Sequence, residues 1–226
     1  MGVVTNNGTM RAINGSMLEF RGPVVNNGML IFISGSTNLY STFSNTINGV
    51  VLNRSSTNNS WVSSTAGKWE ITNAWSLGVA PFDELSVFIT NAITKTVTID
   101  AVTTNTPCEM TIKTLTLSAP SGSTNTLLIS NAGMARPLQV LSNFIADANA
   151  AVVVSNSVLV VTNCSSSSCS SLIIGNVGSG NQMTISDWGH VQSVTGYIGY
   201  NSSSSNNVVL VTDYRSVGLS PVFRRC

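Results

Sequence analysis

The chain has 226 residues, of which 42% are hydrophobic and only 8% are charged, and its formal net charge is +1. It is long enough for a substantial core in one domain or two small ones. The sequence has no basic stripe that could meet phosphates, which argues against a nucleic-acid-binding protein. No segment reaches the roughly 20 apolar residues of a membrane-spanning helix, so we expect no membrane insertion.

The N-terminal segment, residues 1–60, repeats at a nearly constant step. The runs VVTNNGT, VVNNGM and TINGVV place Gly8, Gly28 and Gly49 at almost equal intervals. Asn-Gly pairs mark turns, because both residue types accept positive φ at low cost. Short β-rich runs such as MLIFI lie between them. Strands and turns that recur in this way are typical of a β-solenoid, in which successive coils stack. A tandem hairpin sheet is the alternative, and it would require no fixed period.

A polar stretch at 54–67 leads into a second segment, which we take as residues 61–226. Its residues 67–91 read GKWEITNAWSLGVAPFDELSVFITN. The G-x-W pattern, the second Trp six residues later, S-L-G-V-A-P and the apolar V-F-I run resemble the opening of autotransporter-associated β-strand repeat proteins. The resemblance covers roughly 61–213. It implies a β-solenoid from a large secreted or surface-anchored bacterial protein, of a kind frequent in Verrucomicrobia and Planctomycetes, and it implies no particular chemistry.

The tryptophans of this opening, Trp69 and Trp75, allow two interpretations. Their rings could stack on sugars and form a glycan-binding platform. Alternatively, they cover the first edge of the second segment and bury a large apolar area, which is the commoner role of large aromatic side chains.

Threonines further along suggest a third kind of surface. The Thr-x-Thr pair of Thr96 and Thr98 recurs as Thr114 and Thr116. Stacked Thr ladders on a flat face bind ice in some solenoids, so an ice-binding face is one hypothesis. Threonine is also a good strand residue on a solvent-facing surface.

The one segment with a helix-like pattern is PLQVLSNFIADANAA at 137–151. The β-rich sequence VVVSNSVLVVTN directly after it favours strands here too.

The four cysteines indicate a disulfide rather than a metal site. Cys164 and Cys169 lie five residues apart in NCSSSSC. A metal would need further soft ligands nearby, and a redox pair prefers C-x-x-C. We therefore predict a local disulfide between them, which fits an oxidising compartment and an extracellular or cell-surface location. Cys108 and Cys226 are either partners or free for intermolecular bonds. We predict no metal site and no cofactor.

Two C-terminal segments are copies of one pattern, IIGNVGSGNQMTISDWGHV and TGYIGYNSSSSNNVVLVTDYRSV. Ile174 aligns with Ile198, and Met183 with Val209, so the offset between the copies grows across the Ser/Asn run. Length changes at fixed points of a repeat map to loops, because the strands must stay in register. We therefore predict that this polar run is a corner between strands.

The charged residues offer little for catalysis. The repeat could stack Asp187 and Asp213 one rung apart, as a weak cation or glycan site or as corner residues that share a hydrogen-bonding role. His190 follows Asp187 by three residues, but no nucleophile elbow lies nearby. We therefore predict no catalytic residues and no enzyme.

These observations predict an all-β fold, a β-solenoid of stacked rungs of about 20–26 residues in one or two stacks, with residues 1–60 and 61–226 as its segments. Since the first residues lack the features of a signal peptide, we expect a processed or excerpted part of an exported chain. We expect a non-enzymatic extracellular structural protein whose copies assemble head to tail through open strand edges into a filament or layer. The alternative is an adhesin or passenger segment that binds glycans or surfaces. A polysaccharide-cleaving β-helix enzyme and an ice-binding solenoid are further alternatives.

Overall fold

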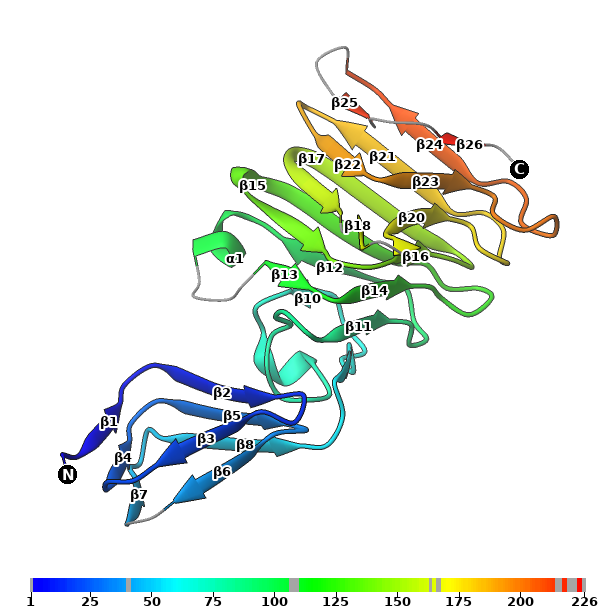
Figure 1. Cartoon of the computed structure of the whole chain (residues 1–226). Helices are drawn as coiled ribbons and strands as arrows, with labels where there is room; N and C mark the ends of the chain where they lie inside the picture. Colours follow the sequence, from blue (N-terminus) through cyan, green and yellow to red (C-terminus); the bar gives the residue numbers. More distant parts are fainter. Residues whose placement is uncertain are drawn as a thin grey trace. The chain divides into compact units, whose positions relative to one another are not determined.

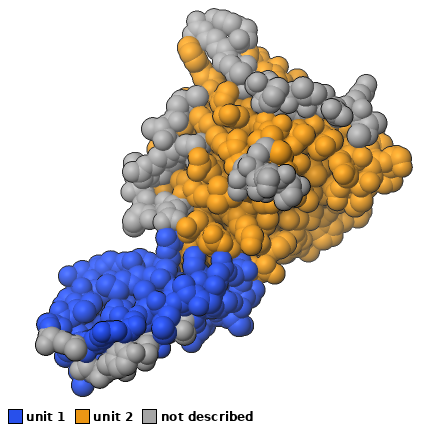
Figure 2. Space-filling model, viewed as in Figure 1, with its two compact units in different colours: residues 1–57 blue, residues 58–226 orange. Residues whose placement is uncertain are grey.

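The computed structural model describes residues 2–39, 42–105, 110–162, 164–165, 168–213, 217–218 and 223–224. This described chain is all-β apart from the five-residue helix α1 (Ala101–Asn105) and the 3-10 helix η1 (Thr72–Ala74), neither of which is long enough to cross a membrane. It divides into two compact units, residues 1–57 and 58–226 (Figures 1 and 2). The boundary predicted from the sequence lies three residues further on, because residues 58–60 form a strand that pairs within unit 2.

The strands of unit 1 pair in parallel. Its described strands are β1 (Val4–Asn6), β2 (Thr9–Ile13), β3 (Met17–Phe20), β4 (Val24–Asn26), β5 (Met29–Ile33), β6 (Ser36–Leu39), β7 (Phe43–Asn45) and β8 (Val50–Arg54). They form sheets in the orders β1-β4-β7, β2-β5-β8 and β3-β6. Partner residues lie 19 to 21 positions apart, as in Val24↔Phe43, Val4↔Val24 and Met29↔Val50. The predicted period is confirmed for these residues, and a tandem hairpin sheet does not fit, because hairpins pair in antiparallel.

Close backbone contacts explain two of the repeating glycines. A Cβ atom on Gly28 would lie 2.1 Å from the carbonyl oxygen of Gly8, and one on Gly49 would lie 2.2 Å from that of Asn26. No side chain fits at these distances. The repeat therefore needs glycine where one strand passes over the turn of the previous one.

Unit 2 contains the longer sheets. Its described strands are β9 (Asn58–Ser60), β10 (Gly67–Lys68), β11 (Ser86–Ile89), β12 (Lys95–Ile99), β13 (Thr111–Ile112), β14 (Thr114–Leu117), β15 (Asn125–Val140), β16 (Phe144–Ala146), β17 (Ala150–Val161), β18 (Cys164–Ser165), β19 (Ser168–Cys169), β20 (Ser171–Ile174), β21 (Gln182–Ser186), β22 (His190–Ser193), β23 (Thr195–Ile198), β24 (Val208–Val211), β25 (Val217–Gly218) and β26 (Phe223–Arg224). One sheet has the order β10-β12-β15-β17-β21-β24, with β13, β22 and β25 attached to it, and another has the order β26-β23-β20-β16-β14-β11-β9. Apart from the antiparallel hairpin β18-β19, the paired strands described in this unit are parallel.

The predicted C-terminal repeat is confirmed in register. Ile174 pairs with Ile198, and Met183 pairs with Val209. The polar run 201–207 connects β23 in one sheet with β24 in the other, so it forms the predicted corner.

The rung length predicted from the sequence is too short for much of unit 2. Register partners in β20 and β23 lie 24 positions apart, within the prediction, but those in β12 and β15 lie 30 apart. The step reaches 31 between β17 and β21, because the β18-β19 hairpin is inserted in that interval. The helix-like segment 137–151 lies in β15, β16 and β17, which confirms the interpretation as strands.

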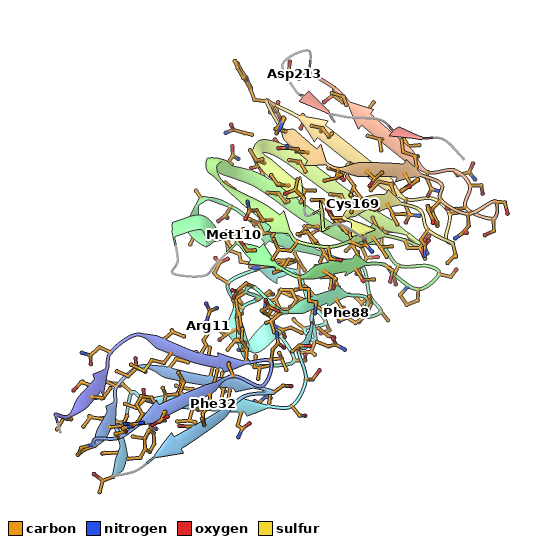
Figure 3. All side chains as sticks on the ribbon, in the orientation of Figure 1. Arg11, Phe32, Phe88, Met110, Cys169 and Asp213 are labelled. Atoms are coloured by element: carbon orange, nitrogen blue, oxygen red, sulfur yellow. The ribbon has the colours of Figure 1, made fainter. Side chains whose placement is uncertain are left out.

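Alternate residues of each long strand fill the interior (Figure 3). In the sheet that contains β12, the residues Val97, Leu127, Val152 and Met183 follow one another in register and are all fully buried. The residues between them along each strand point outward and are mainly Thr, Ser, Ala, Val and Leu. A row of buried aliphatic side chains perpendicular to the strands is what period-2 patterning produces in stacked parallel strands.

Each unit also contains hydrogen-bonded asparagine side chains on successive strands. In unit 1, the amide of Asn6 donates to Asn26 Oδ1 at 2.7 Å, and that of Asn26 donates to Asn45 Oδ1 at 2.7 Å. In unit 2, Asn181 Nδ2 donates to Asn207 Oδ1 at 2.8 Å. An amide carries both a donor and an acceptor, so a column of asparagines can satisfy its own buried polar groups.

Candidate functional site

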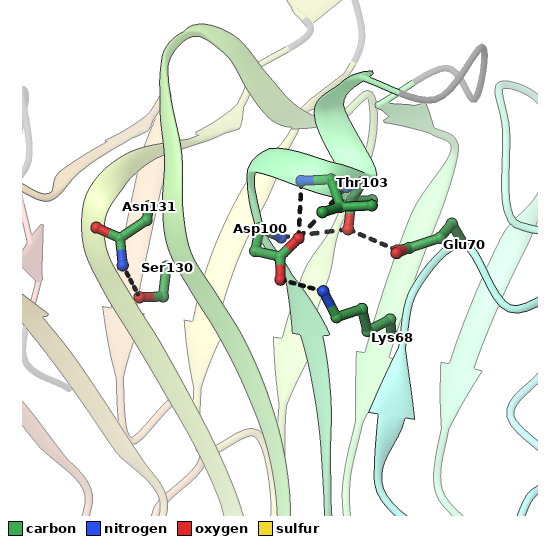
Figure 4. A network of polar contacts seen from close by, with 7 residues as sticks. Lys68, Glu70, Asp100, Thr103, Ser130 and Asn131 are labelled. Carbon is green, nitrogen blue, oxygen red and sulfur yellow. Dashed lines mark hydrogen bonds and ion pairs between the residues drawn. The ribbon is translucent and has the colours of Figure 1, made fainter.

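A polar cluster lies where α1 begins in unit 2 (Figure 4). Lys68, at the end of β10, forms an ion pair with Asp100, which follows β12; the Nζ–Oδ2 distance is 2.6 Å. Asp100 Oδ1 accepts the backbone N–H of Val102 at 2.9 Å, so it also caps the helix. The hydroxyl of Thr103 donates to Glu70 Oε2 at 2.6 Å. A hollow of about 330 Å³ lies beside Asp100 and is lined also by residues 98, 101, 102, 128, 130 and 131.

Within this cluster, Lys68 and Asp100 hold each other in the ionised state. The hydrogen bond from Lys68 lowers the pKa of Asp100, and burial opposes this only in part. The same bond raises the pKa of Lys68. A carboxylate with a lowered pKa is a poor general acid or base near neutral pH. The arrangement therefore fits a structural link between β10, β12 and α1 better than an acid–base site.

A second charged group, Lys95, is buried among oxygen atoms. Its Nζ donates to the backbone oxygens of Asn91, Ala92 and Ile93 and to Asn125 Oδ1, the last at 3.0 Å. The residue is 3% exposed, and burial lowers its pKa. The ammonium group thus closes the turn before β12 and ties that turn to Asn125. No sequence motif indicated this role, because an isolated lysine usually lies at the surface.

Trp69 and Trp75 are buried together with Trp61. No sequence motif indicated a role for this third tryptophan. The exposed fractions of Trp61, Trp69 and Trp75 are 2%, 0% and 2%. Trp75 packs edge-to-face against each of the other two rings, with centroid distances of 5.1 Å, and its Nε1 donates to the Trp69 carbonyl at 2.8 Å. Neither Trp69 nor Trp75 presents a ring face to solvent. Their burial fits the interpretation that they cover the first edge of the second segment, and it does not fit a sugar-stacking platform.

The predicted cysteine pair lies in the β18-β19 hairpin. Cys164 and Cys169 are directly opposite each other in its antiparallel register. Directly opposed residues have Cα atoms about 4.5–5.5 Å apart, within the range that a disulfide spans. Cys108 and Cys226 lie outside the described residues.

Asp187 lies at a corner after β21 and takes part in the hydrogen bonding of that corner. It adopts a positive φ of 48°, and its Oδ2 accepts the hydroxyl of Ser155 at 2.9 Å. Asp213 comes shortly after β24, the strand that pairs with β21 in the same sheet. The register neighbours of His190 are Val158 and Val217, so its strand neighbours supply no nucleophile.

The two Thr-x-Thr pairs do not form one ladder. Thr96 and Thr98 lie on β12, whereas Thr114 and Thr116 lie on β14, which belongs to the other sheet. In the sheet that contains β12, Thr96 pairs with Thr126, but the register partner of Thr126 on the next strand is Ala151. The Thr-x-Thr pattern therefore recurs in strands of two different sheets, and its threonines do not form one stacked surface.

Among the residues that the structure describes, no three His, Cys, Asp or Glu side chains gather closely enough to hold a metal ion. Searches against protein-family models, curated proteins and solved structures find no match for this chain.

Proposed function

We propose that this chain is a non-enzymatic, extracellular structural protein, a β-solenoid whose copies assemble head to tail into a filament or layer. The parallel pairing in both units supports the solenoid, since parallel partners 19 to 32 positions apart require long connections rather than hairpins. An extracellular or cell-surface location is supported by the register of Cys164 and Cys169, which suits a disulfide. The similarity to autotransporter-associated repeat proteins stays a prediction.

The observation that carries the proposal is the open edge of β24. Among the described residues this strand pairs only with β21. Its side chains Val208, Leu210 and Val211 are 50%, 50% and 44% exposed. An apolar strand with an unpaired edge is a template for another strand, and charge or proline, which usually block such edges, are missing from VVLV.

The hydrogen-bonding groups on that edge can be identified. Val208 and Thr212 donate their backbone N–H groups toward β21, to the oxygens of Asn181 and Ile185. Successive N–H groups along a strand point to opposite sides. Val209 and Val211 therefore direct their N–H groups away from β21, to the open side.

The first strands of unit 1 offer a complementary edge. β1, β2 and β3 each pair with one described strand, and Val3 and Met17 nearby are 61% and 54% exposed. A contact between two different edges is heterologous and need not close, so it can propagate into a fibre.

Purified protein tests this function directly. We expect light scattering to rise with concentration and negative-stain electron microscopy to show elongated particles. A monodisperse monomer at high concentration under oxidising conditions would contradict the proposal.

A further inference from the structure

Gly8 lies in the turn between β1 and β2, at a place where the described chain gives no reason for glycine. Its φ is outside the positive range that favours glycine, and a Cβ atom on it would meet nothing within 4 Å. Gly28 holds the same place one strand further, because Thr9 and Met29, which follow the two glycines, are register partners. A Cβ atom on Gly28 would lie 2.1 Å from the carbonyl oxygen of Gly8. Gly28 therefore cannot carry a side chain because another backbone passes close to it, and Gly8 would meet the same restriction only beneath a further backbone.

The hydrogen bonds beside Gly8 indicate where that further backbone would lie. The N–H of Met29 donates to the Gly8 carbonyl at 2.7 Å, so the oxygen that excludes a side chain from Gly28 is also the acceptor of this bond. Val50 repeats the bond one strand further, to the Gly28 carbonyl at 2.8 Å. By the same pattern the N–H of Thr9, the register partner of Met29, points away from β5 to the open edge. A carbonyl oxygen of another strand that accepts this N–H would lie over Gly8.

The asparagine side chains give the direction of such a contact. In unit 1, Asn6 Nδ2 donates to Asn26 Oδ1, and in unit 2, Asn181 Nδ2 donates to Asn207 Oδ1. Each ladder therefore runs from donor to acceptor in chain order. Asn6 is the acceptor end of its ladder, and Asn207, directly before β24, is the donor end of the other among the described residues. One N–H of the Asn207 amide donates to Ser204 Oγ, and the amide has a second. The end of unit 2 that carries β24 thus supplies the donor that would extend the ladder of unit 1.

From these contacts we infer that the turn 6–9 of unit 1 is the receiving end of the head-to-tail contact, and that Gly8 is the residue over which the β24 edge of a second copy passes. The incoming strand places a carbonyl oxygen on the N–H of Thr9 and repeats, between two copies, the stacking that joins β2 to β5 within one copy. The inference rests on the proposed function, and it makes the lack of a side chain at Gly8 a condition of assembly.

The first test compares Gly8→Val with Thr5→Val in sedimentation velocity at increasing concentration. Gly8→Val should stay a monomer, because its new side chain occupies the path of the incoming backbone. Its melting temperature, measured by circular dichroism, should not fall, because the added Cβ meets nothing in the described chain. Thr5 is exposed on β1, and Thr5→Val adds no Cβ atom, so this control should assemble as the unaltered chain does.

The second test mixes Gly8→Val with Val211→Pro. Gly8→Val keeps the edge of β24, whereas Val211→Pro removes an N–H group from that edge and keeps the turn 6–9. Neither variant should assemble alone. The mixture should give a dimer with one copy of each variant, because exactly one pair of intact edges remains.

The outcomes separate this inference from the proposed function. If the unaltered chain assembles and Gly8→Val assembles equally well, the inference is wrong and head-to-tail assembly uses another edge. A mixture of the two variants that stays monomeric would also overturn the inference, and so would a lowered melting temperature of Gly8→Val, which would place the need for glycine within a single copy. A monomeric unaltered chain would overturn both the inference and the proposed function.

Discussion

The side-chain amide of Asn26 donates a hydrogen bond of 2.7 Å to Oδ1 of Asn45, which lies 19 residues further along the chain. Asn26 is fully buried, and its own Oδ1 accepts the amide of Asn6. This ladder satisfies the buried amides of Asn6 and Asn26, and it ties three successive strands of one sheet to one another.

Asn26→Ala should therefore destabilise unit 1 by about 1–3 kcal/mol, because it leaves the buried Asn6 donor without its acceptor. Asn27→Ala is the control, since Asn27 bonds to Asn7 in an exposed ladder and its loss should cost less than about 0.5 kcal/mol. Hydrogen–deuterium exchange of peptides from residues 2–57 measures both. Equal protection in the two variants would contradict the role of the buried ladder.

A second prediction concerns Lys95. Lys95→Met should destabilise unit 2 by about 1–3 kcal/mol, because Asn125 Oδ1 and the oxygens of the preceding turn lose their donor. Lys113 is exposed, so Lys113→Met should be close to neutral. All four tryptophans lie in unit 2, and their fluorescence during urea unfolding reports its stability. A Lys95→Met variant as stable as Lys113→Met would refute the prediction.

The sequence predicted the repeat better than it predicted the side-chain roles. Pairs such as Met183 and Val209 could be aligned because both strands carry the same alternation. The β12 and β14 threonines were misleading, because spacing along the chain does not say which sheet a strand joins. Lys95 and Trp61 carry no motif, and their burial depends on residues more than ten positions away, such as Asn125 and Trp75.

The Lys68–Asp100 pair predicts a pH dependence. The pKa of Asp100 is lowered in the folded protein from its ordinary value of 3.8, so the unfolded chain binds more protons in acid. The stabilisation is present above the unfolded pKa and is lost as the pH falls through the folded pKa. Asp100→Asn keeps an acceptor for Val102 N–H but removes the charge.

We therefore expect Asp100→Asn to be less stable than the unaltered chain at neutral pH, and the difference to shrink below about pH 4. Tryptophan fluorescence during urea unfolding at several pH values measures it. A difference that stays constant into strong acid would show that the charge of Asp100 does not stabilise unit 2.

The opposed register of Cys164 and Cys169 predicts that these residues form a disulfide in the native protein. Peptide mapping without reduction should recover the two cysteines in one cross-linked peptide. Because the closed loop is short, replacing both by serine should cost only about 2 kcal/mol. Recovery of both thiols in the free state would refute the pairing.

Head-to-tail assembly through the edge of β24 is the central claim, and one pair of variants tests it most directly. Val211→Pro removes an N–H group that points away from β21, and proline is tolerated at such edge positions. Val211→Ala removes a similar part of the side chain but keeps the N–H. Sedimentation velocity at increasing concentration should show assembly for the alanine variant and a monomer of unchanged fold for the proline variant. Equal assembly of the two variants, or a monomer for the unaltered chain, would contradict it.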